Sequence, residues 1–217
     1  THLTSFAGTR AGKATDSVGS DRPEGFRLVV ETTGEGATVF VVGNDARGVL
    51  FGVGRLLQEM RMIQGKITLD AELNLTTSPA YSLRGHQLGY RPKTNSYCGW
   101  DLPQWKQYIC DLAIFGCNAI ELIPPRSDDI DDCPHFPRPK LEMMIGMSQL
   151  ADDYGIDVWV WYPALDADYG DAATVEFALK EWGEIYRALP RIDEVFVPGG
   201  DPGHTHPEHL MNLLEKQ

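Results

Sequence analysis

The chain has 217 residues, of which 42% are hydrophobic and 23% are charged. This composition is typical of a folded globular protein and excludes a largely disordered one. The 31 acidic and 19 basic side chains give a formal charge of -12, so the average surface would repel DNA or RNA. No apolar run approaches the roughly twenty residues that a membrane helix needs. We therefore expect neither a nucleic-acid partner nor a membrane partner.

The N-terminal third of the sequence predicts a small α+β unit. Residues 1–25 are polar and small and indicate a surface segment. Two strand-like runs, residues 26–31 and 37–42, flank a Gly-containing turn and predict a hairpin. Apolar residues at helical spacing over residues 44–62 predict a helix capped by Asn44 or Asp45. A short strand over residues 66–69 would complete the unit, and residues 74–82 are typical of a linker.

From residue 81 onward, short apolar strands alternate with amphipathic helices. The predicted strands cover residues 82–88, 117–123, 157–161 and 194–197, and the predicted helices cover residues 102–115, 141–154 and 174–189. Asp101 with Gln104 fits a helix start, and Gly116 and Gly155 fit the positions just after helix ends. A fourth helix begins at His206 and Pro207, with the proline at a plausible first helical position.

This alternation predicts parallel strands with right-handed crossovers, in either an open doubly wound sheet or a closed eight-stranded barrel. The first strand has no Gly-rich phosphate loop after it, and polar or aromatic residues follow every strand, which favours the barrel. The fold class we expect is α/β: an α+β accessory domain over residues 1–78, then the first four βα units of a (β/α)8 TIM barrel over residues 79–217. The remaining half of the barrel, or a second copy, would cover the exposed strand edges.

The residues around the strand ends would surround one cleft if the strands are parallel neighbours. Carboxylates, arginines and aromatic rings together suit a sugar, because aromatic faces cover the apolar side of the ring and charged groups bind its hydroxyls. The candidate substrate-binding residues are Arg84, His86, Tyr90, Glu121, Arg126, Asp128, Trp161, Tyr162, Asp166, His204 and His206. We expect Tyr162 to be a better aromatic platform than Trp159 or Trp161. Arg84, in an apolar strand, needs an ionic partner, for which Asp201 and Glu121 are candidates.

Three segments carry a resemblance to known glycoside hydrolases. "VVGNDARGVLFGVGRLLQEM" resembles the zincin-like accessory domain that precedes the barrel in retaining β-N-acetylhexosaminidases and α-glucuronidases. "YSLRGHQLGYR" resembles their first barrel strand, and this likeness implies a sugar-binding role for Arg84. "VFVPGGDPGH" resembles the fourth strand of the hexosaminidases, whose Gly-Gly-Asp-Glu matches Gly199, Gly200 and Asp201.

The resemblance implies hydrolysis of O-glycosidic bonds by carboxylate acid and base chemistry, with Asp201 as the catalytic residue. The hexosaminidase glutamate that acts as general acid and base is replaced here by Pro202, which cannot transfer a proton. A non-catalytic carbohydrate-binding or interaction module therefore stays open as an alternative. Metal-dependent hydrolysis through His86, His204 and His206 is a weaker one, because the histidines lack a recognisable ligand spacing. We expect no metal and no cofactor.

The four cysteines form no CxxC pair. Cys110 and Cys117 lie in apolar surroundings and are expected to be buried free thiols. Cys98 and Cys133 both lie in predicted loops, so a disulfide between them is possible but not required. The sequence begins at Thr1 rather than at a methionine, which leaves a removed signal peptide open, and we expect a periplasmic or secreted protein.

Overall fold

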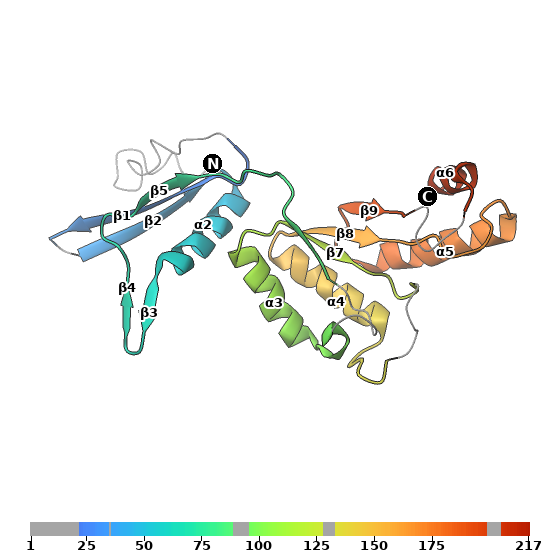
Figure 1. The fold of residues 1–217 in the computed structure, drawn as a ribbon, viewed down its shortest axis with the longest axis horizontal. Coiled ribbons are helices and arrows are strands. Elements are labelled where there is room, and N and C mark those ends of the chain that lie inside the picture. Colours follow the sequence, from blue (N-terminus) through green and yellow to red (C-terminus); the bar gives the residue numbers. More distant parts are fainter. Residues whose placement is uncertain (1–21, 35, 89–95, 128–132, 199–204) are drawn as a thin grey trace. The chain divides into compact units, whose positions relative to one another are not determined.

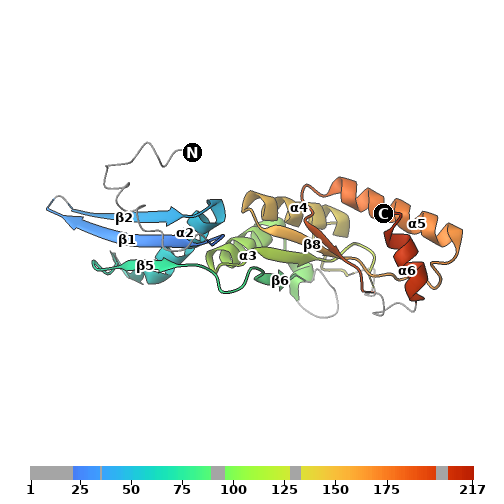
Figure 2. The same ribbon diagram turned by 90° about the horizontal axis from the view of Figure 1, so that it is seen from above.

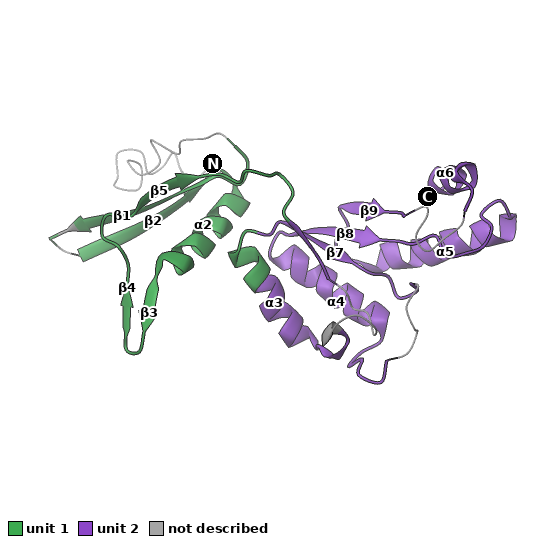
Figure 3. Cartoon of the chain, in the orientation of Figure 1, with its two compact units in different colours: residues 1–84, 111–116 green, residues 85–110, 117–217 purple. Residues whose placement is uncertain are grey.

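The structure is a computed structural model that describes residues 22–34, 36–88, 96–127, 133–198 and 205–217. It forms two compact units (Figure 3). Unit 1 comprises residues 1–84 and 111–116, and unit 2 comprises residues 85–110 and 117–217.

Unit 1 contains a three-stranded antiparallel sheet in the order β2-β1-β5 (Figure 1). β1 (Phe26–Thr33) and β2 (Gly36–Gly43) form the predicted hairpin. β5 (Asn74–Thr77) pairs with the other edge of β1 and places Leu75 opposite Leu28. The expectation of a linker over residues 74–82 is therefore wrong for its first four residues. This strand is short and half polar, and its partner lies far away in the sequence, so the local pattern gave no signal.

The helix α2 (Ala46–Glu59) begins at the predicted cap, because the Oδ1 atom of Asp45 accepts a hydrogen bond from the Gly48 N–H at 2.7 Å. A Cβ atom at Gly52 would collide with Val41, so the glycine lets the helix pack closely on β2. The predicted helix extended too far. After Glu59 the chain forms a second hairpin, β3 (Arg61–Ile63) and β4 (Lys66–Thr68), which turns at Gly65 with a φ of 74°.

Unit 2 contains a four-stranded parallel sheet in the order β6-β7-β8-β9. The strands are β6 (Gly85–Gln87), β7 (Ala119–Leu122), β8 (Asp157–Trp161) and β9 (Glu194–Phe196). The intervening elements are the 3-10 turn η2 (Ser96–Gly99), α3 (Leu102–Ile114), α4 (Lys140–Asp153) and α5 (Ala172–Ala188), and α6 (Pro207–Leu214) follows β9. The predicted alternation of parallel strands and helices is confirmed, although β6 begins three residues later than expected.

The predicted helix ends are also confirmed. Asp101 and Gln104 cap α3 reciprocally, each side chain accepting a hydrogen bond at 3.0 Å from the other residue's backbone N–H. Gly116 and Gly155 follow α3 and α4 with φ values of 85° and 64°, which glycine adopts without steric cost.

The helices α3, α4 and α5 contact one face of the parallel sheet, α3 through Tyr108 and α5 through Trp182. In Figure 2, α4 and α5 lie on the same side of β8. Ile120, Val158 and Val160 point to this face and are fully buried. Met144 and Met147 of α4 line a small space together with Leu88, Leu122 and Ile123. This helix-covered face is the core of unit 2. In the part of the chain that the structure describes, no helix combines the length and the hydropathy that crossing a membrane requires.

Candidate functional site

The second face of the parallel sheet carries a row of polar and aromatic side chains. The strand register places Gln87, Glu121, Trp159 and Glu194 opposite one another on four adjacent strands. Since neighbouring residues of a strand point to opposite faces, all four point away from the buried Ile120 and Val160 side. Gln87 donates a hydrogen bond from Nε2 to Oε1 of Glu121 at 2.7 Å, which holds this carboxylate in place. We call these four residues the polar row.

Trp161 and Phe196 form the next pair along the same face, towards the carboxyl ends of the strands. Trp161 is 8% exposed and Phe196 is 50% exposed. Carboxylates, an amide and aromatic rings thus share one face, which can hydrogen-bond hydroxyl groups and cover an apolar surface at the same time. Glu121 and Trp161, both predicted substrate-binding residues, belong to this face.

His86 lies on the opposite, helix-covered face. Its Nε2 atom is 3.1 Å from the hydroxyl of Tyr108 on α3, and the two rings meet edge to face at 5.7 Å. Its Nδ1 atom is 2.9 Å from the carbonyl oxygen of Gln87. Because a carbonyl can only accept, the contact with Gln87 requires a proton on Nδ1 of His86. His86 is therefore positioned to fix β6 against α3.

Tyr162 also points to the helix-covered face, where it is 1% exposed. Its ring stacks on Trp182 of α5 at a centroid distance of 4.0 Å, with Tyr186 at 6.2 Å. Burial, reinforced by the charge of Glu181, raises the pKa of the Tyr162 hydroxyl well above its usual range. The expectation that Tyr162 is the aromatic platform for a sugar does not fit this position, because the ring is buried against Trp182 and Tyr186 of α5. Trp161, one residue earlier, has the orientation that was expected of Tyr162.

Arg126 and Asp166 meet beyond the carboxyl ends of β7 and β8. Arg126 binds Asp166 in a two-pronged pair at 3.2 and 3.0 Å and binds Glu181 of α5 in a second at 2.8 and 3.0 Å. The Tyr169 hydroxyl donates to Asp166 at 3.1 Å. Burial opposes the charge of Arg126, but the hydrogen bonds to Glu181 and Asp166 outweigh it and raise the pKa of the guanidinium. This cluster joins two loops to α5.

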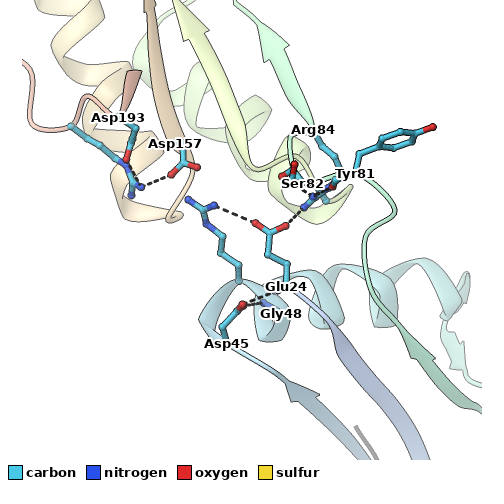
Figure 4. Close-up of polar contacts among 11 residues, drawn as sticks. Glu24, Asp45, Gly48, Tyr81, Ser82, Arg84, Asp157 and Asp193 are labelled. Atoms are coloured by element: carbon cyan, nitrogen blue, oxygen red, sulfur yellow. Dashed lines mark hydrogen bonds and ion pairs between the residues drawn. The ribbon is translucent and has the colours of Figure 1, made fainter. Parts of the chain in front are cut away.

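Arg84 was predicted within the first barrel strand, but it precedes β6 and so lies at the amino end of that strand. Within unit 1 its guanidinium donates to the Glu24 carboxylate at 2.6 Å, to the Gly116 carbonyl at 2.7 Å and to the Tyr81 carbonyl at 2.8 Å (Figure 4). The ionic partner that the structure gives to Arg84 is Glu24, a residue that the sequence did not single out.

A second cluster of ion pairs lies at the amino ends of β8 and β9 within unit 2. Arg191 donates to Asp157 at 2.6 Å and to Asp193 at 2.7 and 3.1 Å, and Asp193 also accepts from the Val158 N–H (Figure 4). The hydrogen bond to Asp193 is the main cause of a raised pKa at Arg191. These contacts tie the loop before β9 to β8, which is a structural role at the edge opposite the strand carboxyl ends.

Four predicted site residues, Tyr90, Asp128, Asp201 and His204, lie outside the described residues. His206 is the N-cap residue of α6, and its ring lies 5.6 Å from that of His209. His209 in turn places Nδ1 at 3.3 Å from a carboxylate oxygen of Asp168. Within the described ranges, no group of three histidine, cysteine or acidic side chains is placed to hold a metal ion.

The sequence did not single out Gln87 and Glu194, and it left Trp159 evenly between core packing and a place in the site. A signal for all three was present, because polar residues at alternate positions of otherwise apolar strands mark one face of a sheet. Glu181 was missed for a different reason: it lies on a helix, and only the fold brings it to Arg126.

Comparison with known proteins supports the fold and not a family. No family model matches the sequence, and no curated protein matches it. Among solved structures, CpGH84B aligns over 100% of this chain at 16% identity with a TM-score of 0.63, and CpGH84D aligns over 98% at 14% identity with a TM-score of 0.59. A GH20 exo-β-N-acetylglucosaminidase from Vibrio harveyi aligns over 78% at 14% identity with a TM-score of 0.57.

The chain covers 36%, 34% and 35% of these three solved structures, which is about a third of each. Partial coverage of this size fits a fragment. The parallel sheet with helices on one face, together with these structural neighbours, shows that the chain has a mixed α/β, glycoside-hydrolase-like fold.

Proposed function

We propose that this chain is part of a glycoside hydrolase that cleaves O-glycosidic bonds by carboxylate chemistry, with N-acetyl-β-hexosaminides as the first substrate class to test. The observation that carries the proposal is the polar row, in which Gln87 holds Glu121 at 2.7 Å beside Trp159 on a face of the sheet opposite the helices. The substrate class follows from the hexosaminidase among the structural neighbours and from the Gly-Gly-Asp run that ends at Asp201.

The proposal includes the fold of the whole protein. The four parallel strands would continue into a closed (β/α)8 barrel, so that the face with the polar row becomes its interior and the helices its outer layer. β9 is an edge strand of the described sheet, and its outer edge can pair with a further strand. The accessory domain would be zincin-like, with the α2 helix on its antiparallel sheet.

Each residue of the proposed site has a role that its position supports. Glu121 binds a sugar hydroxyl, and Gln87 orients its carboxylate. Trp161 packs against the apolar side of the sugar ring, because its indole points to the same face as Glu121. Asp201, outside the described residues, is the candidate catalytic carboxylate. Since Pro202 follows it, the general acid must be a different group from the hexosaminidase glutamate.

The test uses the whole parent protein and a panel of nitrophenyl glycosides that includes the N-acetyl-β-glucosaminide. We expect turnover of at least one substrate. Asp201→Asn should lower kcat by about 10²- to 10³-fold, the usual cost of removing a group that stabilises charge in the transition state. Glu121→Gln should lower kcat/KM by about tenfold or more, because a hydrogen bond to a charged group is lost. Glu184→Gln, at an exposed position of α5, is the matched control and should leave the rate unchanged.

Two results would reject the hydrolase. Binding of sugars with no turnover of any glycoside would assign the protein to the non-catalytic carbohydrate-binding class that Pro202 leaves open. Neither binding nor turnover would remove the carbohydrate assignment altogether.

A further inference from the structure

Two cysteines from separate loops meet near the carboxyl ends of β6 and β7. Cys98 lies in the turn η2, and Cys133 lies 35 residues later, between β7 and α4. The Cys133 thiol points at the Cys98 sulfur with a separation of 3.4 Å. A disulfide bond has a length of about 2.05 Å, so a shift of about 1.4 Å would bring the two sulfurs to bonding distance. Rotation of the two side chains can supply a shift of this size.

The other two cysteines have different surroundings. Cys117 donates from its thiol to the Ala119 carbonyl at 3.1 Å, which uses the sulfur in a local backbone contact. Cys110 lies within α3, and its side chain is half-buried. Cys98 and Cys133 differ from these two cysteines because their sulfur atoms lie close together, although 35 residues separate them in the sequence.

Cys133 also lines an open groove of about 520 Å³. The groove is formed by Pro125, Phe136, Arg138 and Lys140 together with two further prolines. Its two cationic side chains are Arg138, which also pairs with Glu142 at 3.8 Å, and Lys140, so these three side chains together carry one net positive charge on a chain whose formal charge is -12. A small anionic molecule would be attracted to this groove more than to the surface as a whole.

We propose that Cys98 and Cys133 are a redox-sensitive pair that an anionic low-molecular-weight disulfide, such as oxidised glutathione, converts to a disulfide. In the first step the Cys133 thiolate attacks one sulfur of the small disulfide, forms a mixed disulfide and releases one small thiolate. In the second step the Cys98 thiolate attacks the Cys133 sulfur, which forms the Cys98–Cys133 bond and releases the second small thiolate. The two small thiols take up the two protons, so the protein is oxidised by two electrons and the small disulfide is reduced by two.

The order of the two steps follows from exposure. Cys98 is 7% exposed, whereas Cys133 is half-buried and opens onto the groove. Burial, together with the neighbouring Cys133, raises the pKa of the Cys98 thiol and makes it the less reactive of the two towards an external disulfide. Once Cys133 carries the mixed disulfide, Cys98 is the nearest thiol to it.

The bond would restrain a cluster of aromatic residues in α3 and in the chain just before it. Trp100 follows η2 by one residue and packs edge to face on Trp105 at 5.1 Å and on Tyr108 at 5.3 Å. Tyr108 in turn contacts His86 of β6. Oxidation should therefore tie η2 and the adjoining aromatic cluster to the segment that begins at Cys133. This inference is independent of the proposed glycosidase, since its readouts are covalent and thermal.

The experiment treats the reduced, folded protein with oxidised glutathione, blocks remaining thiols with N-ethylmaleimide and maps the digest by mass spectrometry. We expect a Cys98–Cys133 linked peptide, with Cys110 and Cys117 alkylated. A loop of this length should raise the Tm by about 4–16 °C. The variant Cys98→Ser should stop at a glutathione adduct on Cys133, and the variant Cys133→Ser should react several-fold more slowly at Cys98. Cys110→Ser is the matched control and should form the link as the unchanged protein does.

The groove is tested separately. Arg138→Gln should slow oxidation by oxidised glutathione several-fold at low salt but not oxidation by cystamine, which is cationic, whereas Arg187→Gln on the exposed side of α5 should slow neither. The proposal is overturned if the linked peptide forms only after denaturation, if a glutathione adduct on Cys133 persists without resolving, or if all four cysteines are linked at random.

Discussion

Glu24 holds Arg84 through a hydrogen-bonded ion pair of 2.6 Å, although 60 residues separate the two in the chain (Figure 4). The same carboxylate binds Arg47 at 3.2 Å and is only 9% exposed. Glu24 also has a φ of 62°, in the left-handed region that a side chain other than glycine adopts at a cost of about 1–2 kcal/mol. The ion pairs and the hydrogen bond from the Glu24 N–H to Asp45 at 2.7 Å compensate this cost.

We predict that Glu24→Gln lowers the free energy of unfolding by about 3–5 kcal/mol, because it leaves two half-buried guanidinium groups without their common carboxylate. Urea unfolding followed by circular dichroism measures the change. Glu72→Gln, at an exposed position of unit 1, should change the stability by less than about 0.5 kcal/mol. Equal effects of the two substitutions would mean that the ion pairs contribute nothing beyond surface charge.

The stack of Tyr162 on Trp182 predicts a contrast between two substitutions. Trp182→Ala should cost about 3–5 kcal/mol, because it removes a large, fully buried ring. Tyr162→Phe should be close to neutral, since the buried Tyr162 hydroxyl makes no hydrogen bond of normal geometry among the described residues and has only the nearby Glu181 carboxylate as a weak partner. Chemical denaturation of both variants decides the matter, and a large loss on Tyr162→Phe would show that the hydroxyl is bonded in solution.

Tyr186 gives a prediction about pH. Burial raises the pKa of its hydroxyl to about 12, against about 10 in an unfolded chain. A raised folded pKa means that the stabilising contribution is fully present below about pH 10 and is lost as the pH rises towards 12. Tyr186→Phe should therefore flatten the loss of stability in this alkaline range. Tyrosinate absorbance of the native protein and of the variant follows the titration directly, and a midpoint near pH 10 would contradict the burial.

Two substitutions of Arg126 should lower the free energy of unfolding by different amounts. Arg126→Gln should cost about 3–5 kcal/mol, because Asp166 and Glu181 would then face each other without a cation. Arg126→Lys restores the charge but not the two forked pairs, so its cost should be intermediate. For comparison, Arg55→Gln breaks an exposed pair with Glu59 on α2 and should cost about 0.3–0.5 kcal/mol. Unfolding curves of the three variants test the order, which fails if Arg126→Lys matches the unchanged protein.

Substitution of the two glycines after α3 and α4 should change the stability through backbone conformation alone, without a change in side-chain packing. A Cβ atom at Gly116 or Gly155 would meet no heavy atom within 4 Å. Alanine at either position should therefore lower the free energy of unfolding only through its positive φ, by about 1–2 kcal/mol. Gly99 has the same open surroundings without a positive φ. Gly99→Ala should therefore leave the Tm unchanged or raise it, while the other two lower it. A comparable fall at all three positions would point to lost flexibility and not to backbone strain.

The sequence predicted the elements of unit 2 well because the signals for each element lie within or next to that element. Capping residues, C-terminal glycines and apolar spacing define α3, α4 and α5 within one or two residues. Side-chain direction was harder. Tyr162 was placed in the site because it follows a strand, although it shares its parity with the apolar Val158 and Val160, which already indicated the buried face.

Partners distant in the sequence account for the other differences. Nothing near Arg84 indicates Glu24, and nothing near Asn74 indicates that β5 pairs with β1. Such pairings depend on the folded structure, because the order of the strands determines which residues become neighbours. A single sequence carries no local trace of them.

The alternation along β7 also determines which sequence changes this strand can accept. Glu121 lies between Ile120 and Leu122, which point to the opposite face. A single inserted or deleted residue at the start of β7 would reverse every side chain in the strand, moving the carboxylate under α4 and an aliphatic chain onto the face of the polar row. Relatives that retain the site should therefore vary in this strand by substitution, and length changes should be confined to the loops around it.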